Sequence, residues 1–503
     1  MIPEPFHRTT TTGALTVHAG TTISGPGIRQ FVDDLAADGG PRLTIADHGT
    51  IITELTDHLD EFRDLPEPIG VSPSGHSPAD ERYLLEITGD RAVVRATAAE
   101  GLHRGLTTLR QLLNGGPVVT VPGQRIVDTP RVAWRGFSLD VARCFQSVET
   151  VRGIVDMLSL YKFNVLHLHL SDNEGWRLAL PEYPELTTAE SWTIEEIKTL
   201  IAYAGGRHVT VIPELDTPGH SAAVLRAYPE LGVFEPDGEF PTAYLDPNRP
   251  GVDTFLNTIV KYLAEIAPGP YLHIGGDEAF GMPDDLFHQH VAATLQKVRA
   301  TGKTPIGWQE TTRPGLHSGE IFQYWADFAD AVGDQDAAAQ STIPPETLAK
   351  LTAFFRTARE DLSRGFAQGA RVLLSPTRIA YFDGPHAGDA ADPAQHAVRD
   401  RVGYRHYPPR TLEELFAWDP ATLLDGVGTD RIAGVEAALW AETVSGAADA
   451  QFLITSRLPG FAERAWSPEG SKWADYRDRL AAQSPTWRHR DWTYFATTTV
   501  DWK

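Results

Sequence analysis

A short apolar run ends in His273-Ile274-Gly275-Gly276-Asp277-Glu278, where two glycines precede two adjacent acids. Neighbouring residues of a strand point to opposite faces, so these acids share a cavity only beyond the strand's regular end. Paired glycines allow that departure and permit close approach of the backbone to a ligand. Because neighbouring carboxyl groups do not ionise independently, we expect a protonated acid beside an ionised partner. An exposed acidic turn or a helix N-cap is the alternative, which the position after a strand disfavours.

Seven similar runs surround this one, and helical stretches alternate with them from Arg135 onward, as in a parallel α/β fold. The candidate strands are residues 136–140, 165–170, 209–214, 271–274, 304–307, 321–324, 371–374 and 434–439. Eight repeats over about 300 residues predict a (β/α)8 TIM barrel. A doubly wound sheet is the rival fold, but it requires a glycine-rich nucleotide loop after the first strand, which the sequence lacks.

Polar and aromatic residues follow the strands from the second to the eighth. They are Ser171-Asp172, Glu214-Leu215-Asp216, Asp277-Glu278, Trp308-Gln309-Glu310, Trp325, Tyr381-Phe382-Asp383 and Trp440-Ala441-Glu442. The C-terminal ends of barrel strands converge on one site, so we expect these side chains to lie together. Aromatic walls match the apolar C–H faces of a sugar, and carboxylates bind its hydroxyl groups. The pattern therefore predicts a carbohydrate substrate.

The first unit, residues 1–125, is predicted to be a small α+β domain that precedes a catalytic barrel of residues 126–503. Residues 83–87 and 92–96 flank a Gly89-Asp90 turn, which predicts a hairpin. A helical stripe of leucines follows, at Leu102, Leu106, Leu109 and Leu113. Nothing in this unit resembles a reaction centre.

The stretch from His273 to Glu278 resembles the catalytic signature of family 20 glycoside hydrolases, the β-N-acetylhexosaminidases. Similar matches to that family's first three barrel strands are Arg135-Gly136 with Leu139-Asp140-Val141-Ala142-Arg143, His167-Leu168-His169-Leu170-Ser171-Asp172 with Gly175-Trp176-Arg177, and Pro213-Glu214-Leu215-Asp216-Thr217-Pro218-Gly219-His220. The resemblance continues in order to Glu442 and includes the small N-terminal domain, so it covers nearly the whole chain. Asn173-Glu174 departs from the family's more usual acid–Gln pair.

This resemblance implies an exo-acting, retaining hydrolase that removes terminal non-reducing N-acetylglucosamine or N-acetylgalactosamine. In such substrate-assisted enzymes the 2-acetamido carbonyl of the sugar attacks its own anomeric carbon, which gives an oxazolinium intermediate. By this resemblance Glu278 is the general acid and base, Asp277 binds the acetamido N–H, and Tyr381 binds the acetamido oxygen.

The remaining site residues implied by the resemblance fall into three groups. Tryptophans that confine the acetamido group and the sugar face are Trp308, Trp325 and Trp440. Residues that hold ring hydroxyls are Arg135, Asp383 and Glu442. Residues of a supporting network near Glu278 are Asp172, Asp216 and His220.

Three alternatives remain open from the residues. His167-x-His169 could be the histidine pair of a zinc site, but the other strand ends carry Trp and Glu rather than further zinc ligands. We therefore expect no metal and no cofactor. A retaining glycosidase with a protein carboxylate nucleophile needs a second carboxyl group about 5–5.5 Å from the acid. A catalytically inactive sugar-binding homologue is the third alternative, which the intact acid pair disfavours.

Composition restricts the partners. The chain has 503 residues, a formal net charge of −23 and one cysteine, Cys144. That charge repels nucleic acid, anionic membranes and polyanionic substrates, so a neutral or cationic partner is favoured. The family resemblance implies that this partner is a small glycan. Neither a signal peptide nor a membrane-spanning run is visible, and we expect a cytoplasmic protein. The oligomeric state, the sugar epimer and the linkage stay open.

One segment, residues 326–370, is longer than the family usually needs. Its amphipathic part, residues 348–366, predicts an extra helix. We expect this helix to shape the cleft entrance or a subunit contact.

Overall fold

The computed structural model describes residues 1–236, 242–327, 357–358 and 360–503. Its larger part is a closed barrel of parallel strands in the order β10-β13-β14-β15-β16-β17-β8-β9. The strands are β8 Arg135–Asp140, β9 Val165–His169, β10 Thr210–Glu214, β13 Tyr271–His273, β14 Thr304–Trp308, β15 Ile321–Tyr324, β16 Arg371–Leu374 and β17 Ile432–Leu439. All eight predicted strands are present, and the predicted TIM barrel is confirmed.

Helices follow the barrel strands along the chain. They are α3 Val148–Leu160, α4 Ile194–Gly205, α5 Ala222–Ala227, α6 Val252–Ile266, α7 Asp284–Ala300, α11 Thr377–Ala380, α14 Ala447–Ile454 and α15 Leu458–Trp466. In α6, Val252, Phe255, Leu256, Ile259 and Leu263 are buried, at the three- and four-residue spacing of one helix face. Helix α4 begins with a capping box of Thr193 and Glu196.

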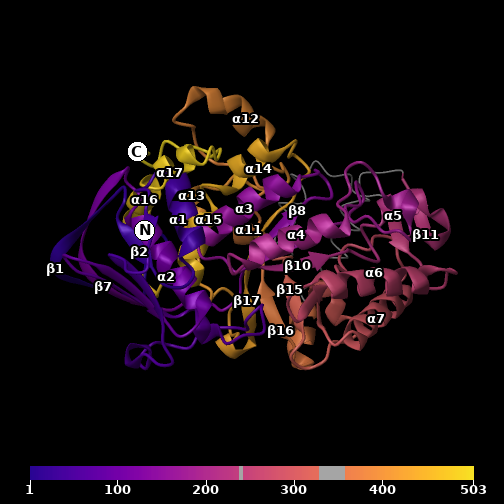
Figure 1. The fold of residues 1–503 in the computed structure, drawn as a ribbon. Coiled ribbons are helices and arrows are strands. Elements are labelled where there is room, and N and C mark those ends of the chain that lie inside the picture. The colour runs from indigo at the N-terminus through magenta and orange to yellow at the C-terminus, as the bar shows by residue number, and fades with distance from the viewer. Residues whose placement is uncertain (237–241, 328–356, 359) are drawn as a thin grey trace.

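Shorter elements complete this part of the chain. They are β11 Gly232–Glu235, β12 Thr242–Leu245, α12 His396–Arg401, α13 Leu412–Phe416, α16 Trp473–Ala481 and α17 Ser484–His489. The yellow C-terminal helices lie beside the N-terminal domain in Figure 1, and Arg490, directly after α17, bonds Asp38 of that domain at 2.7 Å.

The N-terminal domain is a seven-stranded sheet in the order β1-β7-β5-β6-β4-β2-β3, with two helices. Its elements are β1 His7–His18, β2 Thr22–Ser24, α1 Ile28–Ala37, β3 Thr44–Ile45, β4 Ile51–Leu55, β5 Tyr83–Ile87, β6 Ala92–Ala96, α2 Ala99–Leu112 and β7 Val118–Asp128. The predicted hairpin is β5–β6, and the leucine stripe of α2 is buried, worth roughly 1.5–3 kcal/mol per side chain. Because β7 continues to Asp128, this sheet extends past residue 125.

A buried ionic cluster joins the two domains at the N-terminal ends of the barrel strands. Arg135, the first residue of β8, bonds Glu81 of the N-terminal domain at 2.6 and 2.8 Å. Lys162 bonds Asp128, the last residue of β7, at 3.0 Å. These contacts lie at the N-terminal end of the barrel strands, which is the end concerned with stability in this fold.

Most of the predicted extra helix, residues 348–366, lies outside the described residues. Residues 360–366 of that stretch are described and are helical. Among the residues that the structure describes, no helix is both long and apolar enough to cross a membrane.

Candidate active site

The two glycines after β13 turn the chain so that consecutive acids enter the site. Gly275 and Gly276 have φ values of 69° and 102°, a left-handed region that favours glycine. A Cβ on Gly275 would lie 1.7 Å from Asp216 Oδ1, and one on Gly276 would lie 2.5 Å from Thr311 Cγ2. Any other residue would therefore displace the acid loop.

Asp277 and Asp216 form a buried carboxyl pair. Burial and then the Asp216 charge raise the pKa of Asp277 well above its usual value, and burial raises the pKa of Asp216 to about 7. The pair therefore holds at least one proton near neutral pH. The backbone N–H of Gly276 donates to Asp216 Oδ1 at 2.9 Å, which fixes the second carboxyl group against the acid loop. Sequence reasoning expected Glu278 as the main partner of Asp277, whereas Asp216 acts on it more strongly.

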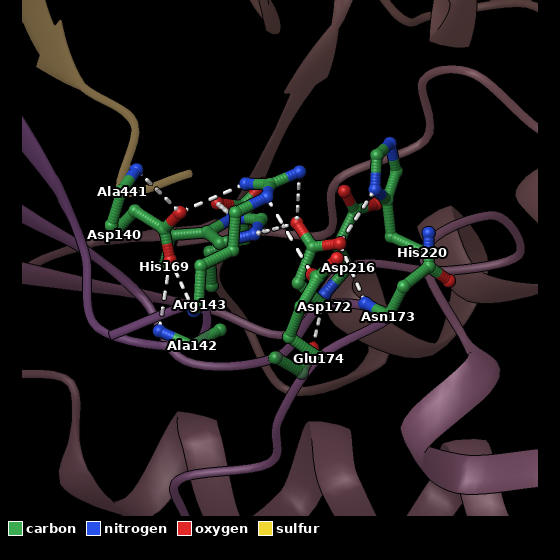
Figure 2. A network of polar contacts seen from close by, with 12 residues as sticks. Asp140, Ala142, Arg143, His169, Asp172, Asn173, Glu174, Asp216, His220 and Ala441 are labelled. Carbon is green, nitrogen blue, oxygen red and sulfur yellow. Dashed lines mark hydrogen bonds and ion pairs between the residues drawn. The ribbon is translucent and has the colours of Figure 1, made fainter. Parts of the chain in front are cut away.

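Glu278, the next residue, is more open to solvent, with 25% of its side chain exposed against 11% for Asp277. His220 Nε2 lies 3.6 Å from Glu278 Oε2 and 3.7 Å from Asp277 Oδ2. His220 Nδ1 lies 2.9 Å from Asp172 Oδ1, and Figure 2 marks this contact. Although burial opposes it, the Asp172 and Asp277 carboxylates raise the pKa of His220 well above its usual value. The structure thus brings together the four residues that were predicted to surround Glu278, namely Asp172, Asp216, Asp277 and His220.

Four predicted aromatic residues form one contiguous cluster of buried rings. The ring centroids of Trp308 and Trp440 are 5.7 Å apart, and those of Tyr381 and Trp440 are also 5.7 Å apart. Trp325 lies parallel to Tyr381 at 6.5 Å. Burial, Tyr407 and then the Asp277 charge raise the pKa of Tyr381, so its hydroxyl group stays a donor beside the acid pair.

Hydrogen bonds to buried carboxylates hold two of the indoles. Trp308 Nε1 donates to Glu214 at 2.9 Å, and Trp325 Nε1 donates to Glu310 at 3.3 Å. These bonds fix the ring planes and leave the ring faces to form a wall.

Asp383 and Glu442 lie at the same end of the barrel. Both carboxylate oxygens of Asp383 are buried and lack a hydrogen-bond partner among the described residues. Burial and then the Glu442 charge raise the pKa of Asp383 well above its usual value. A buried acceptor without a partner is costly, so Asp383 is suited to receive hydroxyl groups of a ligand.

The prediction that Arg135 contacts the sugar is wrong. Arg135 begins β8 and is 1% exposed, with its guanidinium bonded to Glu81 and to backbone carbonyls at the opposite end of the barrel. The arginine at the site is Arg143, which lies 2.8 Å from both Asp140 and Asp172, 3.6 Å from Glu442, and over the ring of Trp440.

Arg143 could have been found from the sequence. It follows the first strand just as Asp172 follows the second, so the pattern of polar residues beyond strand ends includes it. Asp140, the last residue of β8, anchors the turn by accepting from the backbone N–H groups of Ala142 and Ala441, as Figure 2 shows.

Both histidines of β9, the pair considered above as an alternative zinc site, contact carboxylates. His167 Nδ1 lies 2.9 Å from Glu436 Oε1, and His169 lies 2.5 Å from Glu214 and 2.8 Å from Asp172. These separations are hydrogen-bond lengths, shorter than the roughly 3.3 Å between ligands of a tetrahedral zinc ion with bonds near 2.0 Å. The geometry therefore favours a hydrogen-bonded network.

A parallel barrel that gathers adjacent acids and a cluster of aromatic rings at the C-terminal ends of its strands defines a glycoside hydrolase. The family model "Glycosyl hydrolase family 20, catalytic domain" matches residues 132–469, and "Glycosyl hydrolase family 20, domain 2" matches residues 1–129. The chain belongs to glycosyl hydrolase family 20, which confirms the family predicted from the sequence.

Relatives and solved structures agree over the full length. A β-N-acetylhexosaminidase from Cellulomonas fimi is 32% identical, and the match covers 100% of this chain and 97% of that protein. The N-acetyl-β-hexosaminidase of Streptomyces plicatus, solved with thio-NAglucal, has a TM-score of 0.82 at 30% identity, covering 100% of this chain and 97% of that one. The family 20 enzyme of Streptomyces coelicolor gives 0.81 at 30% identity, covering 100% and 98%.

Proposed function

We propose that this enzyme removes terminal non-reducing N-acetylhexosamine residues from small glycans by retaining, substrate-assisted hydrolysis. The observation that carries this function is a buried acid, Asp277, beside a more exposed one, Glu278, next to a wall of aromatic rings. The names of the relatives support it, as does a mutant of the Streptomyces plicatus enzyme solved with the product GlcNAc.

In the first step Glu278 protonates the leaving oxygen while the acetamido carbonyl oxygen attacks the anomeric carbon. The proton shared by the carboxyl pair moves to Asp216, so that ionised Asp277 accepts a hydrogen bond from the acetamido N–H and stabilises the positive charge that develops. Tyr381 donates to the acetamido oxygen and orients it. Holding the nucleophile in this orientation lowers the activation barrier by roughly 7–11 kcal/mol relative to a free nucleophile.

In the second step Glu278, now ionised, takes a proton from water as the water attacks the anomeric carbon. The oxazolinium ring opens, the acetamido group is restored, and the configuration is retained because the carbon is attacked twice. Trp308, Trp325 and Trp440 confine the acetamido group, and Asp383, Glu442 and Arg143 bind ring hydroxyls, Arg143 taking the role expected of Arg135.

Hydrolysis of matched aryl β-glycosides tests this function. The purified chain should release the aryl group from the N-acetylglucosaminide or the N-acetylgalactosaminide at least about a thousandfold faster, as kcat/KM, than from the glucoside that lacks the acetamido group. Comparison of the two acetamido epimers and chitobiose then gives the preferred sugar. Comparable rates on the glucoside would contradict the proposal, and no release from any substrate would identify an inactive sugar-binding homologue.

A further inference from the structure

A buried carboxylate links the two halves of the site. Glu214, the last residue of β10, is fully buried and accepts from Trp308 Nε1 through Oε1 at 2.9 Å. Its other oxygen, Oε2, lies 2.5 Å from His169 Nδ1. One side chain thus contacts both the aromatic wall and the histidine that leads towards the general acid.

His169 connects Glu214, through Asp172 and His220, to the more exposed part of the site. Its second ring nitrogen, Nε2, lies 2.8 Å from Asp172 Oδ2, and Asp172 Oδ1 lies 2.9 Å from His220 Nδ1. His220 in turn presents Nε2 to Glu278. Figure 2 shows His169, Asp172 and His220 in this order, with Arg143 against the same Asp172 oxygen that His169 contacts.

Both ring nitrogens of His169 face carboxylates, so both act as donors. A neutral imidazole has only one N–H and would leave one of these two short contacts without a proton between its atoms. Although burial opposes it, Glu214 and Asp172 accordingly raise the pKa of His169 well above its usual value. The imidazolium ion therefore holds Asp172 at a fixed distance from Glu214, which itself is fixed by Trp308.

We propose that His169 is a positioning residue for the general acid: it locks the orientation of Asp172, so that His220 is held against Glu278. This inference rests on the proposed function. Asp172 cannot rotate without breaking its bond to His169, and a rotated Asp172 would release His220 Nδ1. Loss of His169 would then weaken proton donation by Glu278 while leaving the aromatic wall around the acetamido group assembled.

The chain offers a matched control in His167. It lies two residues away on β9, is as buried as His169, and also contacts Glu214, at 3.1 Å. Its other nitrogen faces Glu436 rather than Asp172. His167 therefore shares the burial, the strand and the Glu214 contact but lies outside the path to Glu278.

The experiment compares His169→Gln and His167→Gln on chitobiose, whose leaving group needs protonation, and on an activated aryl N-acetylglucosaminide. For His169→Gln we expect kcat/KM to fall about tenfold more on chitobiose than on the aryl substrate, a part of the hundredfold or more that a general acid supplies. His167→Gln should lower both by the same factor. Thermal unfolding of each variant separates loss of the fold from loss of the acid, and His169→Asn provides a second variant.

A double-mutant cycle with Asp172→Asn tests the path itself. If His169 acts through Asp172, the double variant should be little worse on chitobiose than Asp172→Asn alone. Equal losses on both substrates for His169→Gln, or additive losses in the cycle, would overturn the inference. The proposed function would still stand in that case if the wild-type enzyme hydrolyses both substrates and Glu278→Gln loses more activity on chitobiose than on the aryl substrate.

Discussion

Glu278→Gln is expected to lower kcat/KM on chitobiose by about 10²–10⁴-fold, the range that a positioned general acid contributes. The amide fills the same volume but has no acidic proton for the leaving oxygen. An activated aryl N-acetylglucosaminide should lose far less, because its leaving group departs as an anion. Steady-state kcat/KM on both substrates measures the difference, since this ratio reports the step in which the leaving group departs.

Glu265→Gln is the matched control, because it makes the same Glu-to-Gln substitution at an exposed position of α6. It should retain wild-type kcat/KM on both substrates. An equal loss on chitobiose and on the aryl substrate for Glu278→Gln would contradict the acid role.

Asp277→Asn is expected to lower kcat/KM by about 10²–10³-fold on chitobiose and on the activated aryl substrate alike, a loss typical of removing one group that stabilises transition-state charge. The amide keeps the volume of the carboxylate but cannot balance the positive charge of the oxazolinium ring. Because the defect lies in nucleophilic attack, a better leaving group does not repair it.

Mass spectrometry of the intact chain during turnover provides the second readout for Asp277→Asn. We expect no covalent glycosyl-enzyme, whereas Asp285→Asn, an exposed position at the start of α7, should behave as wild type. Near-normal activity of Asp277→Asn, or a trapped covalent adduct, would favour the alternative glycosidase with a protein nucleophile.

The barrel could be predicted because its strands are short, buried and separated by helical stretches. The ring cluster followed from the same pattern, since strand ends of a parallel barrel meet at one rim. The motif resemblance places Arg135 at the sugar, whereas the predicted strand of residues 136–140 already sets Arg135 before the strand and Arg143 after it. Arg135 and Arg143 belong to the same matched segment, yet they lie at opposite ends of β8.

The carboxyl pair of Asp216 and Asp277 depends on register, which the sequence does not specify. In the barrel Glu214 of β10 pairs with His273 of β13, so the residues that follow each strand lie opposite one another. The same register places β9, β13 and β14 side chains around Glu214, which no local motif indicates. Long-range pairing of this kind becomes visible only once the barrel is closed.

The most direct test of the nucleophile is the rate on aryl N-acetylglucosaminides whose acetamido methyl group carries none to three fluorine atoms. Fluorine withdraws electron density from the carbonyl oxygen without touching the leaving group. If this oxygen attacks the anomeric carbon, kcat/KM should fall steadily with each fluorine, by at least about tenfold in all, or 1.4 kcal/mol. A rate independent of fluorination would show that the sugar's own amide is not the nucleophile.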